Sequence, residues 1–353
     1  MRRTGIVRDS RYLEHKTGIH HVEVPQRLET VYNMLDRNRL KERLKNITPR
    51  LASLEEIEMV HDPRYIEKIM NTAGEPLRYL DPDTVTSERT CEAAFLAVGG
   101  VFEAVKSVLT DELDNAFALI RPPGHHAERN RQMGFCIFNN IALAAEYARR
   151  HFGLHRILIV DWDVHHPNGT QHIFEKTSRV LLFSTHRFPF FPGTGGLKEI
   201  GLGEGRGFTI NVPLPSQRDD SDFCEVYRNI LVPVALEFQP QLILVSAGFD
   251  THYDDPIGGM KVSEHGYAYL ADTVLEIAEK TCRGKVVVMI EGGYDLGAMR
   301  KSIKAVLETM SSEIPESIKR KIENNIKDNS TVSDTIQNVI EIHKPFWKCF
   351  KDV

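Results

Sequence analysis

The chain has 353 residues, enough to bury a sizeable core in one large domain or two smaller ones. Its 41% hydrophobic and 26% charged content is ordinary for a soluble globular protein, and the net charge of −5 gives no basis for a nucleic-acid-binding surface. The five scattered cysteines form no CxxC pair, which argues against a disulfide framework or a cysteine zinc site. No apolar run suggests a signal peptide or membrane span, so we expect a cytoplasmic protein.

The N-terminal third is expected to be helical and charged, with helices over residues 25–40, 54–70 and 88–109. Continuously apolar runs follow at residues 116–120, 156–161, 180–186, 242–248 and 286–293. Continuous rather than alternating apolarity suits strands of a parallel sheet that is buried on both faces.

Further helices are predicted between these strands, over residues 139–152, 225–238 and 263–281. Strands alternating with helices predict an α/β fold with right-handed crossovers. The tail from about residue 311 is polar and helix-prone and carries no chemical motif. We therefore interpret residues 1–353 as a single domain, with 311–353 as a C-terminal helical extension.

Chemically active side chains follow each predicted strand. The segments after the strands read RPPGHHAE, DWDVHHPNGT, STHRFPFFPGTGG, AGFDTHYDDPIGG and EGGYDLG. Ligands of open parallel sheets bind beyond the carboxyl ends of the strands. These strand ends would bring histidine, aspartate and tyrosine side chains to one rim, which predicts an active site there.

Three of these residues suit a catalytic metal. Asp163 and His165 are two positions apart at a strand end, so their side chains can point the same way. Asp250, at another strand end, is the expected third ligand. Two carboxylates and one imidazole, with positions left for water and substrate, describe a site for zinc or a similar divalent ion. Alternation points His166 away from His165, so we expect it to pack or support rather than bind metal.

The remaining polar residues suit proton transfer at that metal. His125 and His126 would accept a proton from water and return one to a leaving amine, with Asp161 and Asn168 orienting their imidazoles. The hydroxyl of Tyr294, in a glycine-rich turn, would donate a hydrogen bond to a developing oxyanion.

Aromatic residues near the rim predict a narrow apolar slot. Phe135 is expected close behind the histidine loop, and Phe188, Phe190 and Phe191 of the HRFPFFPGTGG loop are expected beside it, so that two opposed rings of this set would form the slot. Such a slot would suit the methylene stem of a lysine or polyamine and present an amide to the metal.

The chain resembles the histone deacetylase family, in particular its class II members and their bacterial amidohydrolase relatives. The resemblance covers roughly residues 5–310 and lies in motifs that occur in the family's order: RPPGHHAE, MGFCIFNN, ILIVDWDVHHPNGTQHIF, FFPGTGG, LVSAGFDTHYDDPIGG and EGGYDLG. It implies the arginase-like three-layer α/β/α fold, with a central, mostly parallel sheet.

The resemblance also implies roles for individual residues. Asp163, His165 and Asp250 match the zinc ligands, and His125 and His126 match the tandem histidines that move protons. Tyr294 matches the tyrosine that polarises the scissile carbonyl. The substrate-binding positions that match are Gly134, whose carbonyl receives the substrate N–H, Phe135 and Phe191 as tunnel walls, and Ile257 at the rim.

Two structural potassium ions are implied as further cofactors. The first, beside the zinc, matches Asp161, Asp163, His165, Ser184 and Thr185, with side chains contributed by Asp161 and Ser184. The second, more remote ion matches Phe174, Thr177, Val180 and Phe208, largely through backbone carbonyls.

The chain departs from the family's pattern at three places. Pro167 stands where the family usually has glycine, so the loop before Asn168 is either shifted or already at negative φ. Asn168 is the class II residue, and its uncharged side chain should leave His126 less basic than a carboxylate would. The first loop reads HVEVPQRL at residues 21–28 instead of HPERPERL.

The function expected from these residues is zinc-dependent hydrolysis of N-acyl-lysine amides in peptides or proteins. The alternative within this chemistry is an acetylpolyamine or another small acylated amine. Ile257, where a polyamine deacetylase carries a glutamate, does not select for a cation, although Glu14, Glu23 or Asp83 would be able to replace it. A dimanganese ureohydrolase and a binding module without turnover remain as other classes, and the sequence leaves a homo-oligomer open.

Overall fold

The computed structural model describes residues 2–312 and 332–351. Its central feature is an eight-stranded sheet in which every pair of neighbours runs parallel. In spatial order the strands are β2 (Leu44–Ile47), β1 (Thr4–Val7), β5 (Asn115–Ala118), β10 (Val286–Ile290), β9 (Leu242–Ala247), β6 (Ile157–Asp161), β7 (Val180–Arg187) and β8 (Thr209–Leu214). The predicted α/β class and parallel sheet are confirmed, and β3 (Arg78–Tyr79) and β4 (Val85–Thr86) form a small antiparallel pair apart from it.

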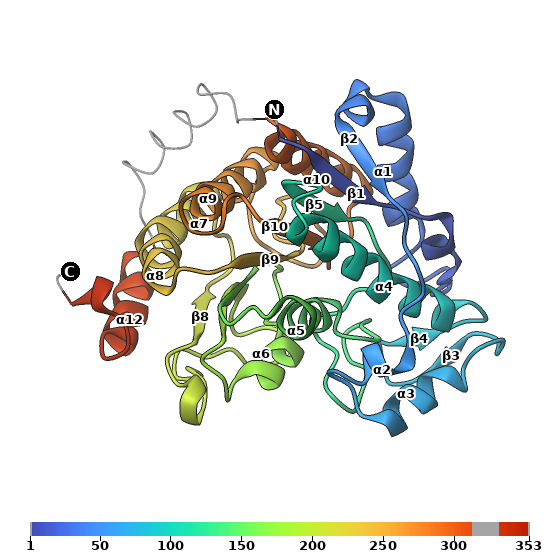
Figure 1. Cartoon of the computed structure of the whole chain (residues 1–353), viewed down its shortest axis with the longest axis horizontal. Helices are drawn as coiled ribbons and strands as arrows, with labels where there is room; N and C mark the ends of the chain where they lie inside the picture. Colours follow the sequence, from blue (N-terminus) through green and yellow to red (C-terminus); the bar gives the residue numbers. More distant parts are fainter. Residues whose placement is uncertain (1, 313–331, 352–353) are drawn as a thin grey trace.

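Helices cover both faces of the sheet (Figure 1). On one face lie α4 (Thr90–Leu109), α5 (Asn140–Phe152) and α6 (Asn168–Phe174). On the other lie α1 (Gln26–Arg37), α9 (Glu264–Cys282) and α10 (Leu296–Ser311). The strands between them are buried along their whole length in β5, β6, β9 and β10, which explains their continuous apolar sequences.

The register of the central strands aligns their carboxyl ends. Asp161 at the end of β6 is paired with Ser184 of β7 and with Ser246 of β9. Ala247, the next residue of β9, is paired with Ile290 at the end of β10. The segments that follow these strands therefore begin at one edge of the sheet, where ligands of parallel sheets bind.

Two predicted helices differ from the structure. The segment 54–70 contains two helices, α2 (Leu54–Ile57) and α3 (Pro63–Met70), because Asp62 caps α3 and Pro63 begins it. The helix predicted over 225–238 begins earlier, in α7 (Asp220–Val226), where the Asp219 side chain accepts hydrogen bonds from the Ser221 and Asp222 amides. It then passes through a π-helical turn (Tyr227–Leu231) into α8 (Val232–Phe238), with Pro233 in the first turn.

The described part of the C-terminal extension packs at the far edge of the sheet. Helix α12 (Ser333–His343) lies against β8, and the indole of Trp347 donates a hydrogen bond to the Gly207 carbonyl at 2.9 Å. The carboxylate of Glu237 accepts bonds from the Lys348 and Cys349 amides. The tail is helical over α12, residues 313–331 lie outside the described residues, and the helical extension as a whole stays a prediction.

A buried histidine in the segment between α2 and α3 contacts the loop before α5, and it allows the effect of pH on the stability of the fold to be tested. The Nδ1 of His61 lies 2.9 Å from the Glu128 carbonyl, and its Nε2 accepts a hydrogen bond from the Asn139 amide at 2.9 Å. The Asn139 contact requires a neutral ring, because a protonated Nε2 cannot accept a hydrogen bond, and burial lowers the pKa of His61 from 6.5 to about 4. Between about pH 4 and 6.5, His61 is therefore neutral in the folded chain and protonated in the unfolded chain.

We expect this histidine to make the protein less stable as the pH falls from 7 to 5. Because the unfolded state binds the extra proton, His61 should remove about 1–2 kcal/mol of folding free energy over this range. Urea unfolding should show that loss in the wild type relative to His61→Gln, whatever the variant's overall stability. His155→Gln, at an exposed position, should keep the wild-type pH dependence. Parallel pH profiles for wild type and His61→Gln would contradict the assignment.

Candidate metal and catalytic site

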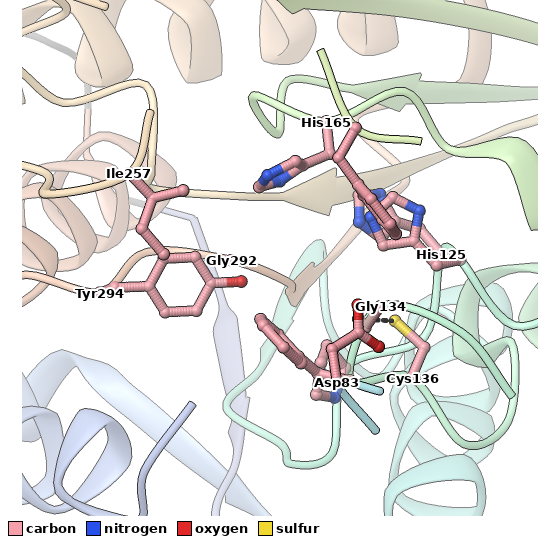
Figure 2. A pocket seen from close by; sticks show the side chains of 12 residues that line it. Asp83, His125, Gly134, Cys136, His165, Ile257, Gly292 and Tyr294 are labelled. Atoms are coloured by element: carbon pink, nitrogen blue, oxygen red, sulfur yellow. Dashed lines mark hydrogen bonds between the residues drawn. The ribbon is translucent and has the colours of Figure 1, made fainter. Parts of the chain in front are cut away.

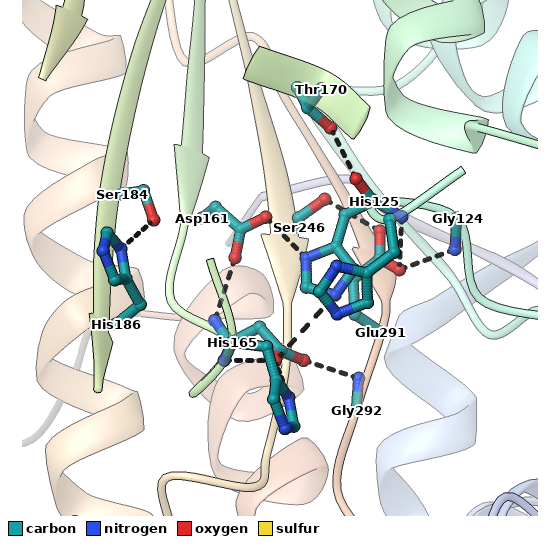
Figure 3. A network of polar contacts seen from close by, with 12 residues as sticks. Gly124, His125, Asp161, His165, Thr170, Ser184, His186, Ser246, Glu291 and Gly292 are labelled. Atoms are coloured by element: carbon teal, nitrogen blue, oxygen red, sulfur yellow. Dashed lines mark hydrogen bonds and ion pairs between the residues drawn. The ribbon is translucent and has the colours of Figure 1, made fainter. Parts of the chain in front are cut away.

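The predicted site residues lie beyond the carboxyl ends of β5, β6, β9 and β10. Figure 3 shows His125, Asp161 and His165 among them. The tandem histidines follow β5, Asp163 and His165 follow β6, Asp250 follows β9, and Tyr294 follows β10. All of these elements are buried parallel strands, so the polar segments after them are held by the rigid sheet.

Two carboxylates and one imidazole form the floor of the site. The Nδ1 of His165 lies 2.9 Å from Asp163 Oδ1 and 3.3 Å from Asp250 Oδ2. Backbone amides fix both acids, since Gly292 N donates to Asp163 Oδ2 and Val164 N donates to Asp250 Oδ1. The second oxygen of Asp250 is buried and accepts no hydrogen bond.

These three residues fit a divalent cation. Their ligand atoms lie within 4.8 Å of one another, and all three residues are buried. Burial and the neighbouring Asp163 raise the pKa of Asp250 to about 7, because the two buried carboxylates are poorly solvated and repel each other when both are ionised. A metal ion would remove that penalty and give the unbonded Asp250 oxygen a partner.

Two glycines leave room around the carboxylates. A Cβ atom at Gly248 would collide with the Asp163 carboxylate, and one at Gly292 would collide with the Asp250 carboxylate. Glycine is therefore required at these positions for steric reasons, because any side chain would displace a candidate ligand.

The two tandem histidines have different partners. His125 Nδ1 lies 3.0 Å from Asp161 Oδ2, and His126 Nδ1 lies 2.7 Å from Asn168 Oδ1. Burial disfavours the charge on His125, but Asp161 and Asp163 outweigh it and raise its pKa to about 10. Burial and the adjacent His125 hold the pKa of His126 well below its usual value. One ring of the pair is therefore suited to carry charge and the other to accept a proton.

Pro167 does not disturb the Asn168 contact. Its φ is −79°, within the range that proline allows, and Asn168 reaches His126 in the family's expected manner. His166, the neighbouring imidazole, turns away from the floor as predicted. Its two ring nitrogens lie 2.8 Å from Thr194 Oγ1 and 2.9 Å from Gln171 Oε1.

A narrow cavity of about 90 Å³ leads to this floor (Figure 2). All four predicted substrate-binding residues line it, and so do both tandem histidines, His165 and Tyr294. The complete lining is Asp83, Pro123, His125, His126, Gly134, Phe135, Cys136, His165, Phe191, Ile257, Gly292 and Tyr294. The Tyr294 hydroxyl points into the cavity toward the histidines, which come from the other side.

Some of the aromatic residues near the rim line the cavity, and others pack against the residues that line it. The rings of Phe135 and Tyr294 meet edge to face at 5.9 Å, and Phe191 meets His126 in the same way at 5.1 Å. Phe190 stacks on His165 at 5.1 Å, and the Arg187 guanidinium lies 4.2 Å from the centre of the Phe190 ring. Phe135 and Phe191 are the two rings of this set that line the cavity, and Phe188 and Phe190 do not line it.

Glu291, which the sequence interpretation passed over, supports the histidine loop (Figure 3). One of its carboxylate oxygens accepts hydrogen bonds from Gly124 N at 2.7 Å and His125 N at 3.2 Å, and the other accepts from Ser246 Oγ at 2.8 Å. The sequence contained a sign of this role, because Glu291 is an acidic residue directly after the apolar run VVVMI, and a carboxylate in such a place needs hydrogen-bond partners.

A buried ionic cluster holds the tyrosine turn and was also missed. Arg27 donates to the backbone carbonyls of Gly293 at 2.6 Å and Glu291 at 2.5 Å, and its guanidinium lies 5.1 Å from the Tyr294 ring centre. Glu23 accepts from Arg27 and from Arg121, each at 2.6 Å, and all three side chains are fully buried. The HVEVPQRL segment thus supplies Glu23 and Arg27, whose buried ion pair supports the turn that carries Tyr294. Because Glu23 is bound to two arginines, it is not available to a substrate.

The residues predicted for the two potassium sites lie near β6, β7 and the end of α6. Asp161 Oδ1 accepts a hydrogen bond from Asp163 N at 3.0 Å, and Ser184 Oγ lies 2.9 Å from His186 Nδ1 on the neighbouring strand. The second set surrounds the end of α6 and the start of β7, where the Phe208 carbonyl accepts a bond from Leu182 N. Both potassium sites stay predictions.

Comparison with known proteins agrees with this geometry. Residues 21–310 match the model of the histone deacetylase domain. The chain is 37% identical over 364 residues to a probable deacetylase of Archaeoglobus fulgidus, covering 99% of both chains. It is also 37% identical to the polyamine deacetylase HDAC10 of Danio rerio and to histone deacetylase 5 of Arabidopsis thaliana, and spans about half of their lengths, 50% and 49%.

A solved structure gives the same result. The HD domain of HDA15 superposes with a TM-score of 0.89 at 33% identity, covering 99% of this chain and 97% of that one. The chain therefore belongs to the histone deacetylase family, and its class of activity is that of a deacetylase. This assignment favours amide hydrolysis over the ureohydrolase alternative. None of the helices in the described residues is long and apolar enough to cross a membrane.

Proposed function

We propose that the chain is a zinc-dependent deacylase that hydrolyses the amide of N-acetyl-lysine in peptides or proteins. The observation that carries the proposal is the joint position of three groups at one narrow cavity. His165 of the Asp163–His165–Asp250 floor, the tandem histidines and Tyr294 all line it. In this proposal Asp163, His165 and Asp250 bind the zinc.

The shape and polarity of the cavity support an acylated lysine. Phe135 and Phe191 give it apolar walls, which suit four methylene groups ahead of an amide. Gly134 lies in the wall, where its carbonyl would receive the substrate N–H. Ile257 at the rim offers nothing to a second cationic group, so a polyamine would lose solvation there without a partner.

Asp83 favours a second candidate, an acetylpolyamine. It is the one carboxylate, among Glu14, Glu23 and Asp83, that lines the cavity. Glu23 is buried against two arginines, and Glu14 lies beside Lys16 on the surface. A polyamine ammonium would find its counter-charge at Asp83, and the zebrafish relative is called a polyamine deacetylase.

When bound, zinc would polarise the acyl carbonyl and make a nearby water more acidic. His126, the ring held neutral, takes the proton of the attacking water. His125, charged beside Asp161, lends positive charge to the tetrahedral oxyanion, and the Tyr294 hydroxyl donates a hydrogen bond to it. His126 then passes its proton to the leaving nitrogen as the C–N bond breaks, which yields acetate and a free amine.

Potassium is proposed as a structural companion of this site. A cation beside Asp161 and Ser184 would offset the negative charge of the buried aspartates. The more remote set, which comprises Phe174, Thr177, Val180 and Phe208, would stiffen the turn between α6 and β7.

A comparison of substrates tests the proposal. The zinc-loaded chain is assayed on acetyl-lysine peptides, on peptides with longer acyl groups and on acetylspermidine. We expect kcat/KM for the acetyl-lysine peptide to exceed that for acetylspermidine by about 10-fold or more, equivalent to about 1.4 kcal/mol. If acetylspermidine is the faster substrate, and Asp83→Asn removes that advantage, the polyamine alternative replaces the peptide proposal.

A further inference from the structure

A buried carboxylate lies directly behind Asn168 and has no part in the mechanism above. Glu128 is only 8% exposed and follows the tandem histidines in the same loop. Its Oε1 accepts a hydrogen bond from Asn168 Nδ2 at 2.7 Å and lies 2.8 Å from His172 Nδ1. The chain thus contains a continuous series of contacts from the Glu128 carboxylate through the Asn168 amide to the His126 ring.

Glu128 decides which way the Asn168 amide faces. An ionised carboxylate only accepts hydrogen bonds, so the Asn168 NH₂ must point toward it. The other groups near Nδ2 are also acceptors, namely the His126 carbonyl at 3.3 Å and the Met133 sulfur at 3.4 Å. With the NH₂ committed to that side, the Asn168 oxygen faces His126 Nδ1 at 2.7 Å.

The orientation of the amide in turn selects the tautomer of His126. An amide oxygen only accepts, so Nδ1 must carry the ring hydrogen when His126 is neutral. Nε2 is then the acceptor nitrogen of a ring that lines the cavity. A reversed amide would donate to Nδ1 and favour the opposite tautomer, whose Nε2 already holds a hydrogen and accepts no proton from water.

We propose that Glu128 is a positioning residue of this site, which fixes the Asn168 amide and thereby the proton-accepting tautomer of His126. The proposal deepens the deacylase function and rests on it. The sequence suggested that His126 is supported only by the uncharged Asn168 amide. The structure adds a charged group, because the Glu128 carboxylate binds the other end of that amide. The amide separates the charge from the imidazole and transmits its orientation.

The same arrangement explains why an aspartate would not serve at position 168. A carboxylate there would face the Glu128 carboxylate at the distance of the present 2.7 Å hydrogen bond. Two acids that close repel unless they share a proton. Asn168 and Glu128 therefore act as a matched pair in this chain, so changing both should be tolerated better than changing Asn168 alone.

A second series of the same kind, away from the cavity, provides a matched control. His166 Nε2 lies 2.9 Å from Gln171 Oε1, and Gln171 Nε2 donates to Glu199 Oε2 at 2.7 Å. The side chains are again imidazole, amide and carboxylate, but His166 does not line the cavity. Glu199→Gln therefore removes an equivalent charge without acting on the reaction.

The test uses the zinc-loaded full chain with Glu128→Leu, Glu128→Gln and Glu199→Gln. We expect Glu128→Leu to lower kcat on an acetyl-lysine peptide by about 10–100-fold with KM nearly unchanged. Glu128→Gln can still accept from Asn168, so it should recover most of that kcat. Glu199→Gln should stay within about twofold of the wild type. Asn168→Asp should lose activity, and adding Glu128→Gln should restore part of it.

Nitrogen chemical shifts of ¹⁵N-labelled histidine rings supply a readout independent of turnover. The wild type should show His126 protonated at Nδ1, and Glu128→Leu should show a mixture of tautomers. The inference is overturned if Glu128→Leu keeps both kcat and the His126 signals, or if Glu199→Gln lowers kcat as much. If the wild type hydrolyses no acyl substrate, the proposed function fails, while the ring signals still decide the role of Glu128.

Discussion

Tyr294→Phe should lower kcat for acetyl-lysine hydrolysis by about 10²–10³-fold while KM changes little, because the hydroxyl acts on the oxyanion rather than on the bound substrate. The tyrosine is held by contacts that phenylalanine would keep. Its backbone amide donates to Asp255 Oδ2 at 2.7 Å, and Arg27 lies 5.1 Å from its ring centre. Burial and the nearby Asp250 raise the pKa of its hydroxyl well above 10, so it remains a hydrogen-bond donor at neutral pH.

Steady-state kinetics with an acetyl-lysine peptide would measure this effect. Tyr253→Phe, in which an exposed tyrosine loses the same hydroxyl, is the matched control and should retain wild-type kcat. Unchanged melting temperatures would exclude unfolding as the cause. If Tyr294→Phe kept kcat within about twofold, the oxyanion role of Tyr294 would be wrong.

The centre of the fold could be predicted because its strands bury both faces. In β6 and β10 every residue is buried, and the resulting apolar runs are visible in the sequence. The outer strands β1, β2 and β8 were not predicted. In β2, Lys45 and Asn46 are exposed at the sheet's edge, so its four residues carry no continuous apolar signal. Similarly, one proline, Pro63, divides a segment whose composition favours a single helix.

The candidate ligands could be predicted because parallel strands end together. Asp163 and Asp250 are far apart in sequence, yet they follow neighbouring strands, β6 and β9, in aligned register. The supporting residues had no such rule. Arg27 donates to the Glu291 carbonyl from 264 positions away in the sequence. Glu128 is connected to the site only because it accepts a hydrogen bond from the Asn168 amide. Such contacts depend on how the loops pack, which spacing along the chain does not encode.

The second large effect concerns the metal floor. Stripping zinc with a chelator should abolish hydrolysis, and Asp250→Asn should bind zinc at least about 100-fold more weakly, because removing a direct ligand should cost no less than disturbing its supporting contacts. Asp250 offers a buried oxygen without a hydrogen bond, the atom best placed to gain from a cation. Asp254→Asn, an exposed carboxylate in the same loop, should behave as the wild type.

The metal-free forms provide a check on folding. Asp250→Asn removes one of two adjacent buried carboxylates, so the metal-free variant should melt no lower than the metal-free wild type. Loss of activity in this variant would then reflect loss of zinc and not loss of structure. A metal-free variant that melts well below the metal-free wild type would contradict the repulsion between the two carboxylates, and a folded variant that still binds zinc tightly would remove Asp250 from the proposed ligand set.

The most direct measurement is a titration of the stripped wild-type chain with zinc, followed by the rate of acetate release from an acetyl-lysine peptide. The proposed zinc-dependent mechanism predicts that activity rises linearly and reaches a plateau at one zinc per chain at the Asp163–His165–Asp250 site, and that Asp250→Asn stays inactive at the same point. A fully zinc-loaded chain that hydrolyses no acyl-lysine substrate would contradict it and favour a binding module. Activity that requires two manganese ions per chain would contradict it as well.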